Sequence, residues 1–141
     1  MAEVEVRMVQ VSVSASVAVS EGPTLPMSMV LDPESYTFTS VTLAPTGQSG
    51  DHEQVVLLPD KGDPVLLAVR ARTEAGQPAT VTFSAKGTPE AVPPLTVDGV
   101  LLVWGADSVR AVLPGGLDTL SVGHDGDQSV RIDMLACLAV P

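Results

Sequence analysis

The chain has 141 residues, of which 45% are hydrophobic and 17% charged, and its 7 basic and 17 acidic side chains give a net charge of −10. A chain of this length buries roughly 70% of its unfolded surface on folding, so the composition predicts one globular domain and excludes an intrinsically disordered chain. The sequence has no run of about 18 apolar residues and no basic-then-apolar leader, so we expect neither a membrane span nor classical secretion. The acidic balance disfavours binding to nucleic acid or to an anionic membrane surface.

The N-terminal segment, residues 3–19, alternates apolar and polar side chains over about three times the length of a typical strand. Its apolar residues move from even to odd positions partway along: Val4 and Val6, then Val9, Val11 and Val13. A β-bulge or a passage between sheets produces such a change of phase. We therefore expect residues 1–20 to form a long strand or arm that pairs with a neighbouring subunit or another partner.

The segment after the arm, residues 20–35, contains three prolines. This composition predicts a loop or an irregular crossover rather than a strand. The chain is therefore expected to consist of an arm (residues 1–20), a proline-rich linker (residues 21–35) and a body (residues 36–141), all within one domain.

The body is interpreted as a series of short strands separated by turn-forming residues. The predicted strands cover residues 36–43, 54–58, 65–73, 79–85, 95–97, 100–104, 108–113, 117–122 and 128–140. Residues 74–78 predict a hairpin loop, and Asp98-Gly99 predicts a two-residue type I′ hairpin. The last strand is apolar on both faces from Leu135 onward, which indicates a place in the centre of a sheet.

The predicted fold class is all-β. Gly or Pro interrupts almost every window of about ten residues, so no helix is expected. Short strands at this spacing predict a β-sandwich with jelly-roll or Greek-key-like connections and a long N-terminal strand or arm.

The residues that could carry chemistry do not form a recognisable site. The His124-Asp125-Gly126-Asp127 segment lacks the ligand pattern of a calcium loop and a partner for acid–base catalysis, and its Asp-Gly pair favours a solvated hairpin turn. His52, beside Asp51, falls in a polar loop and is interpreted in the same way. Cys137 lies in an apolar strand, where we expect it to be buried, and a single cysteine cannot form an internal disulfide. We therefore predict a protein that is not an enzyme and has no cofactor or metal site.

Three features of the sequence indicate contacts with other proteins. Trp104 ends an apolar strand and is either a core or sheet-edge anchor or a contact residue in a subunit interface. Arg70 and Arg72 point outward from the strand at residues 65–73, so we expect them to face acidic partner surfaces. Together with the arm, they make up the predicted interface of a homo-oligomer: Val4, Val6, Val9, Val11, Val13, Arg70, Arg72 and Trp104.

Several motifs between residues 53 and 140 carry a resemblance to a known group of proteins. They are Val65-Leu66-Leu67-Ala68-Val69-Arg70-Ala71 with the following Gly-Gln-Pro turn, Leu95-Thr96-Val97-Asp98-Gly99, Leu113-Pro114-Gly115-Gly116 and Val130-Arg131-Ile132-Asp133-Met134. In this pattern the chain resembles the small all-β virion surface proteins of tailed actinobacteriophages, which include capsid decoration proteins and related head or tail surface proteins.

The resemblance implies a structural protein of the virion exterior. Such a protein is made soluble in the host cytoplasm, binds the major capsid protein or another virion protein, and reinforces the outer surface of the capsid. The acidic net charge suits the outside of a shell better than its DNA-facing inside. The alternatives are a phage tail, baseplate or receptor-contacting module and, from a different class, a β-sandwich enzyme of unknown chemistry.

Overall fold

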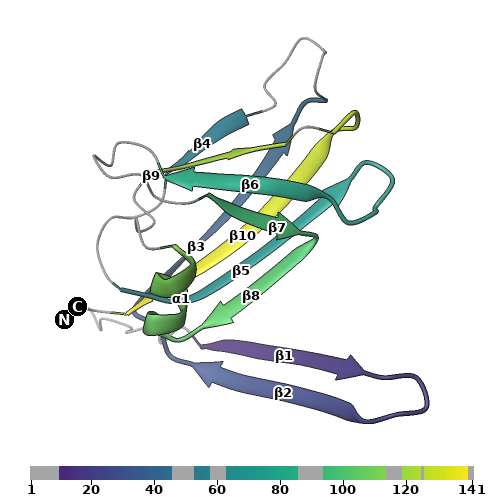
Figure 1. Cartoon of the computed structure of the whole chain (residues 1–141). Coiled ribbons are helices and arrows are strands. Elements are labelled where there is room, and N and C mark those ends of the chain that lie inside the picture. Colours follow the sequence, from purple (N-terminus) through teal and green to yellow (C-terminus); the bar gives the residue numbers. More distant parts are fainter. Residues whose placement is uncertain are drawn as a thin grey trace, which may run out of the picture.

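In the residues that the structure describes, the protein is all-β apart from one short helix, which confirms the predicted all-β fold class. The structure is a computed structural model and describes residues 10–45, 53–57, 63–85, 94–113, 119–124 and 126–139. Within these ranges the elements are β1 (Val11–Ala18), β2 (Thr24–Leu31), β3 (Ser35–Leu43), β4 (Glu53–Leu57), β5 (Asp63–Thr73), β6 (Thr80–Ala85), β7 (Leu95–Asp98), β8 (Val100–Trp104), α1 (Ala106–Val112), β9 (Thr119–Gly123) and β10 (Val130–Ala139) (Figure 1).

The body contains two four-stranded antiparallel sheets. The first, here called the β10 sheet, has the strand order β3-β10-β5-β8, and the second, the β9 sheet, has the order β4-β9-β6-β7. β10 lies between β3 and β5, as its two apolar faces predicted. From β3 onward, successive strands change sheet at every connection except β6 to β7, which is typical of jelly-roll connections.

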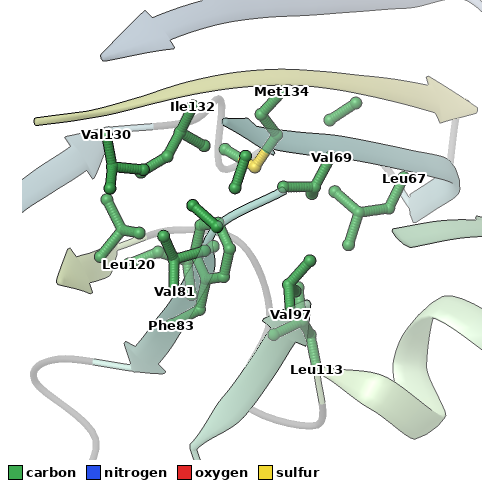
Figure 2. Close-up of a cluster of buried hydrophobic side chains, with 14 of the residues drawn as sticks. Leu67, Val69, Val81, Phe83, Val97, Leu113, Leu120, Val130, Ile132 and Met134 are labelled. Carbon is green, nitrogen blue, oxygen red and sulfur yellow. The ribbon is translucent and has the colours of Figure 1, made fainter. Parts of the chain in front are cut away.

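The hydrophobic core lies where the inner faces of the two sheets meet. Ile132 and Met134 on β10 point toward Val81 and Phe83 on β6 (Figure 2). The period-2 patterns of the sequence place these residues inward, and Phe83 is only 2% exposed. The other buried members of the cluster are Leu43, Leu67, Val69, Ala71, Ala79, Val97, Val109, Leu113, Leu120, Val122, Val130 and Ala136.

Helix α1 lies where we predicted a strand over residues 108–113, so that prediction was wrong. Val109 and Leu113 are buried and Val112 packs against the same core. Val112 and Leu113 follow Val109 by three and four positions, which is the spacing of one helical face. Val109 and Leu113 also fit a period of two, because Ala111 lies between them, and this ambiguity misled the prediction.

The two predicted hairpins lie where the chain passes from one sheet to the other. The loop predicted around Gly76 is a hairpin loop, because Arg72 and Pro78 form an antiparallel bridge and the N–H of Thr73 donates to the Gln77 carbonyl (2.8 Å), but β5 and β6 on either side of it belong to different sheets. β7 and β8, on either side of Asp98-Gly99, also belong to different sheets. In the described ranges, Glu21 is the only non-glycine residue with a positive φ, so Asp98 does not have the conformation of a type I′ turn. Gly99 has φ 79° and connects these two passages between the sheets. Its N–H donates to the Ala79 carbonyl (2.8 Å), and its own carbonyl accepts from the N–H of Ala71 (2.7 Å).

The predicted linker contains a strand, which corrects the loop expected over residues 20–35. β2 pairs with β1 in continuous antiparallel register, from Val11 opposite Leu31 to Ala18 opposite Thr24. Pro26 is tolerated because β2 has a neighbour on one side only. The described strand of the expected N-terminal arm, β1, is thus one half of a hairpin, visible as the purple and blue pair at the bottom of Figure 1. This hairpin, residues 11–31, is called the arm below.

Candidate interaction surfaces

The arm has one apolar and one polar face. The β1–β2 register brings four apolar pairs onto the same side: Val11 and Leu31, Val13 and Met29, Ala15 and Met27, and Val17 and Leu25. The opposite side carries mainly serine, threonine and proline. No residue of either strand is buried. Beyond each other, β1 and β2 have no extensive contact with any other element in the described part of the chain.

The predicted interface valines are only partly placed by the structure. Val11 and Val13 lie on the apolar face of the arm and are half-buried. Val4, Val6 and Val9 lie outside the described residues.

A second apolar surface lies on the outer face of the β10 sheet. The registers of β3, β10, β5 and β8 place a row of exposed or half-buried apolar residues side by side across this sheet: Phe38, Leu135, Ala68 and Leu102. In the next apolar row, Tyr36 is exposed and Trp104 is half-buried, whereas Cys137 and Leu66 between them are fully buried. Phe38 is 60% exposed, and Tyr36 and Val100 are also exposed. An open hollow of about 360 Å³ lies among Phe38, Val100 and Leu135. The face therefore offers aromatic and aliphatic side chains to a partner.

The neighbouring part of the same face is charged. Arg70 and Arg72 are both exposed, as predicted, and the register places them beside Asp133 and Arg131 of β10. The Asp133 carboxylate accepts hydrogen bonds from Ser40 Oγ (2.6 Å), from a terminal nitrogen of Arg70 (2.8 Å) and from Arg131 Nε (3.2 Å).

The hydrogen bonds from Ser40 and Arg70 lower the pKa of Asp133 from 3.8 to about 2, although burial acts in the opposite direction. The Asp133 side chain is 8% exposed, whereas both arginines are more than half exposed. Solvent screens the exposed ends of the two ion pairs. The buried carboxylate therefore depends strongly on the Ser40 hydroxyl, which has no charge for solvent to screen.

Asp133 should make the stability of the fold depend on acidity. Because folding lowers its pKa, the carboxylate contributes stability above about pH 4, and this contribution of about 2 kcal/mol is lost as the pH falls toward and below about 2. In Asp133→Asn, the free energy of unfolding at neutral pH should fall by a similar amount, and its decrease in acid should become shallower. Urea unfolding between pH 6 and pH 2 measures both effects.

The control for this prediction is Asp107→Asn. Asp107 also pairs with an arginine, Arg110, but its side chain is fully open to solvent. This variant should keep the acid dependence of the parent protein. An Asp133→Asn protein with the same acid dependence as the parent would contradict the prediction.

A polar hollow of about 460 Å³ lies at the β9–β10 connection. Its lining includes Thr73, Gln77, Thr80, His124 and Asp127. His124 is 6% exposed, so the solvated turn predicted at this segment is wrong for this residue. Its Nδ1 accepts a hydrogen bond from the N–H of Gly126 (3.2 Å), which leaves Nε2 to donate to the Ala44 carbonyl (2.6 Å). Asp125 lies outside the described residues.

His124 therefore connects the end of β3 to the turn before β10. His124→Ala removes both of these hydrogen bonds, so the free energy of unfolding should fall by about 1–3 kcal/mol. Gln128→Ala, at an exposed residue of the same hollow, should change it by less than about 0.5 kcal/mol. Chemical denaturation of the two variants tests the structural role of His124. Equal free energies of unfolding for His124→Ala and Gln128→Ala would disprove that role.

The other candidate residues from the sequence are buried, half-buried or outside the described ranges. Cys137 is buried as predicted, and burial raises the pKa of its thiol. Trp104 is half-buried at the end of β8, opposite Leu66. His52 and Asp51 lie outside the described residues. In the part of the chain that the structure describes, no three His, Cys, Asp or Glu residues cluster as metal ligands, and no helix is long and apolar enough to cross a membrane.

Part of both surfaces was not predicted from the sequence. Met27 and Met29 were assigned to a linker, and Phe38 was seen only as part of a strand. The alternation Leu25, Met27, Met29, Leu31 in the sequence was a signal for β2. The grouping of Arg131 and Asp133 with Arg70 depends on the register of β10 against β5, for which the sequence contained no signal.

Comparison with known proteins adds no assignment. No protein-family model matches the chain. A search of curated proteins likewise finds no match to its sequence.

Proposed function

We propose that this chain is a structural, non-enzymatic protein of a phage virion that binds the outer surface of the capsid and reinforces it. The observation that carries the proposal is the pair of uncovered apolar surfaces, one on the arm and one on the outer face of the β10 sheet. The arm is joined to a body with a well-packed core, and the sheet face is part of that body. Their exposure is thus not the consequence of a poorly formed fold.

Exposed apolar surfaces of this kind are characteristic of proteins that assemble with others. Monomeric soluble proteins rarely expose contiguous apolar patches larger than a few hundred Å². Here Tyr36, Phe38 and Val100 are exposed on one sheet face, and Val17 and Leu25 on the arm. Both surfaces are built on strands, which hold side chains in fixed positions for a repeated contact.

The virion assignment is supported by the resemblance described above and by the charge. A net charge of −10 disfavours a position against packaged DNA and suits the exterior of a shell. The arginines around Asp133 provide a basic area for an acidic partner such as a capsid surface.

Purified virions of the phage that encodes the chain test the proposal. Mass spectrometry should detect the chain in amounts comparable to the major capsid protein, and cryo-electron microscopy should show it as a regular lattice on the head. Absence of the chain from virions would disprove the proposal.

The second candidate is a phage tail, baseplate or receptor-contacting module. The exposure of Tyr36 and Phe38 favours it, because aromatic residues are frequent anchors at contact sites. In that case the same images should show a few copies at the tail and none on the head.

A further inference from the structure

We infer that the arm of one copy of this chain packs with its apolar face on the outer face of the β10 sheet of a second copy. The inference rests on the proposed assembly function and names the partner for these two surfaces. Three properties of the described residues carry it: the uncovered faces, their charges and their dimensions.

The arm requires a partner to be well ordered. An isolated two-stranded hairpin is only marginally stable in water, and a third strand or a packed surface is needed to stabilise it. The apolar face of the arm consists of four cross-strand pairs, none of them buried. Since no other described element of its own chain covers this face, an apolar surface of a second molecule is the natural cover.

The charges favour a second copy as that molecule. From Val11 to Leu31 the arm carries a single charge, Glu21 at its tip, so it can approach another acidic chain with little repulsion. The outer face of the β10 sheet gathers three arginines against one aspartate: Arg70, Arg72, Arg131 and Asp133. This face is therefore basic in a chain whose net charge is −10, and it attracts an acidic copy.

The dimensions of the two surfaces agree. At a rise of about 3.4 Å per residue, the eight-residue strands of the arm are about 27 Å long, and the outer face extends about 20 Å along β5 from Leu66 to Arg72. With the two apolar pairs nearest the tip above the two apolar rows of the sheet, the tip reaches the arginines. Glu21 then lies near the charge that attracts it.

A symmetric pair satisfies both copies at once. Each copy carries one arm and one sheet face, so a twofold axis covers both arms and both faces with the same contact. Each arm is a ribbon about 27 Å long and about 10 Å wide. The two contacts together bury on the order of 1,100 Å² of arm and sheet surface. This area is close to the roughly 1,200 Å² at which stable protein complexes begin.

Sedimentation of the full chain from about 1 to 100 µM tests the inference. The parent protein should self-associate. Met29→Asp, on the apolar face of the arm, and Phe38→Asp, on the sheet face, should each weaken association by at least about 100-fold, because each places an unpaired carboxylate in the contact. Ser28→Asp, on the polar face of the arm, and Thr96→Asp, on the exposed side of β7, introduce the same charge elsewhere and should leave association unchanged.

Cross-linking identifies which surfaces meet. Met29→Cys and Phe38→Cys proteins, mixed and treated with a short bis-maleimide, should give a mixed dimer, whereas Thr96→Cys should give none with either. Cys137 is buried and does not compete for the reagent. A monomeric parent protein would overturn the inference. Cross-linking of Met29→Cys only to itself would also overturn it, because the arms would then pack on each other.

The results also separate this inference from the proposed function. A chain that self-associates through the arm but is absent from virions would retain the inference and disprove the virion role. A monomeric chain found on the capsid would do the reverse.

Discussion

Truncation of Phe83 to alanine should lower the free energy of unfolding by about 3–5 kcal/mol, the usual cost of deleting a buried aromatic side chain. Phe83 is 2% exposed and lies between the two sheets, where its ring faces Ile132 and Met134 across the core (Figure 2). Loss of the ring removes apolar contacts and leaves a cavity lined by residues of both sheets. Native domains have only about 5–15 kcal/mol of stability in total, so this loss should be a large fraction of the stability of the fold.

The other phenylalanine of the chain provides a matched control. Phe38 is 60% exposed on the outer face of the β10 sheet, so Phe38→Ala should change stability by no more than about 0.5 kcal/mol. Urea denaturation at low protein concentration measures folding separately from association. Equal destabilisation by the two truncations would contradict the placement of the core between the sheets.

Replacement of Gly99 by valine should destabilise the fold by about 2–4 kcal/mol. Its positive φ, 79°, disfavours a side chain by about 1–2 kcal/mol. A Cβ atom there would lie 3.0 Å from the Cβ of Pro78, so crowding adds to the strain. Gly99 also holds the backbone of Ala71 and Ala79 through its two hydrogen bonds, so any shift of Gly99 is transmitted to both sheets.

Gly76→Val separates these two contributions. Gly76 has nearly the same φ, 82°, but no atom lies within 4 Å of a Cβ built there. The control variant should therefore lose only the conformational part, about 1–2 kcal/mol. Thermal or urea unfolding of the two proteins gives the difference. A Gly76→Val protein as unstable as Gly99→Val would show that crowding against Pro78 has no importance.

The sequence predicted the parts of the fold that depend on side-chain alternation. The inward positions of Val69 and Phe83, the outward position of Arg70 and the central place of the last strand all follow from which faces of a strand are apolar. These are local properties, because alternation along a strand determines the face on which each side chain lies, whichever strand is its neighbour.

The parts that the sequence did not predict depend on distant neighbours or on competing local signals. Pro26 argued against a strand, yet β2 is an edge strand that tolerates it. Asp98-Gly99 indicated a hairpin within one sheet. Packing between the sheets decides instead that the chain crosses there from one sheet to the other. His124 carries no local sign of burial, since its partner Ala44 is 80 residues away in the sequence. The two interaction surfaces could be assembled only once the strand registers were known.

The central position of β10 also determines when the protein can fold. β3 and β5 of the same sheet both pair with β10, which the ribosome synthesises after all the other strands of the two sheets. At about 5–20 residues per second, β3 waits roughly 5–20 s for its partner during translation. The nascent chain must therefore keep an apolar, unpaired strand in solution until β10 has been synthesised. The sheet can consequently form only after β10 has been synthesised, and deletion of β10 would remove the strand on which the sheet is built.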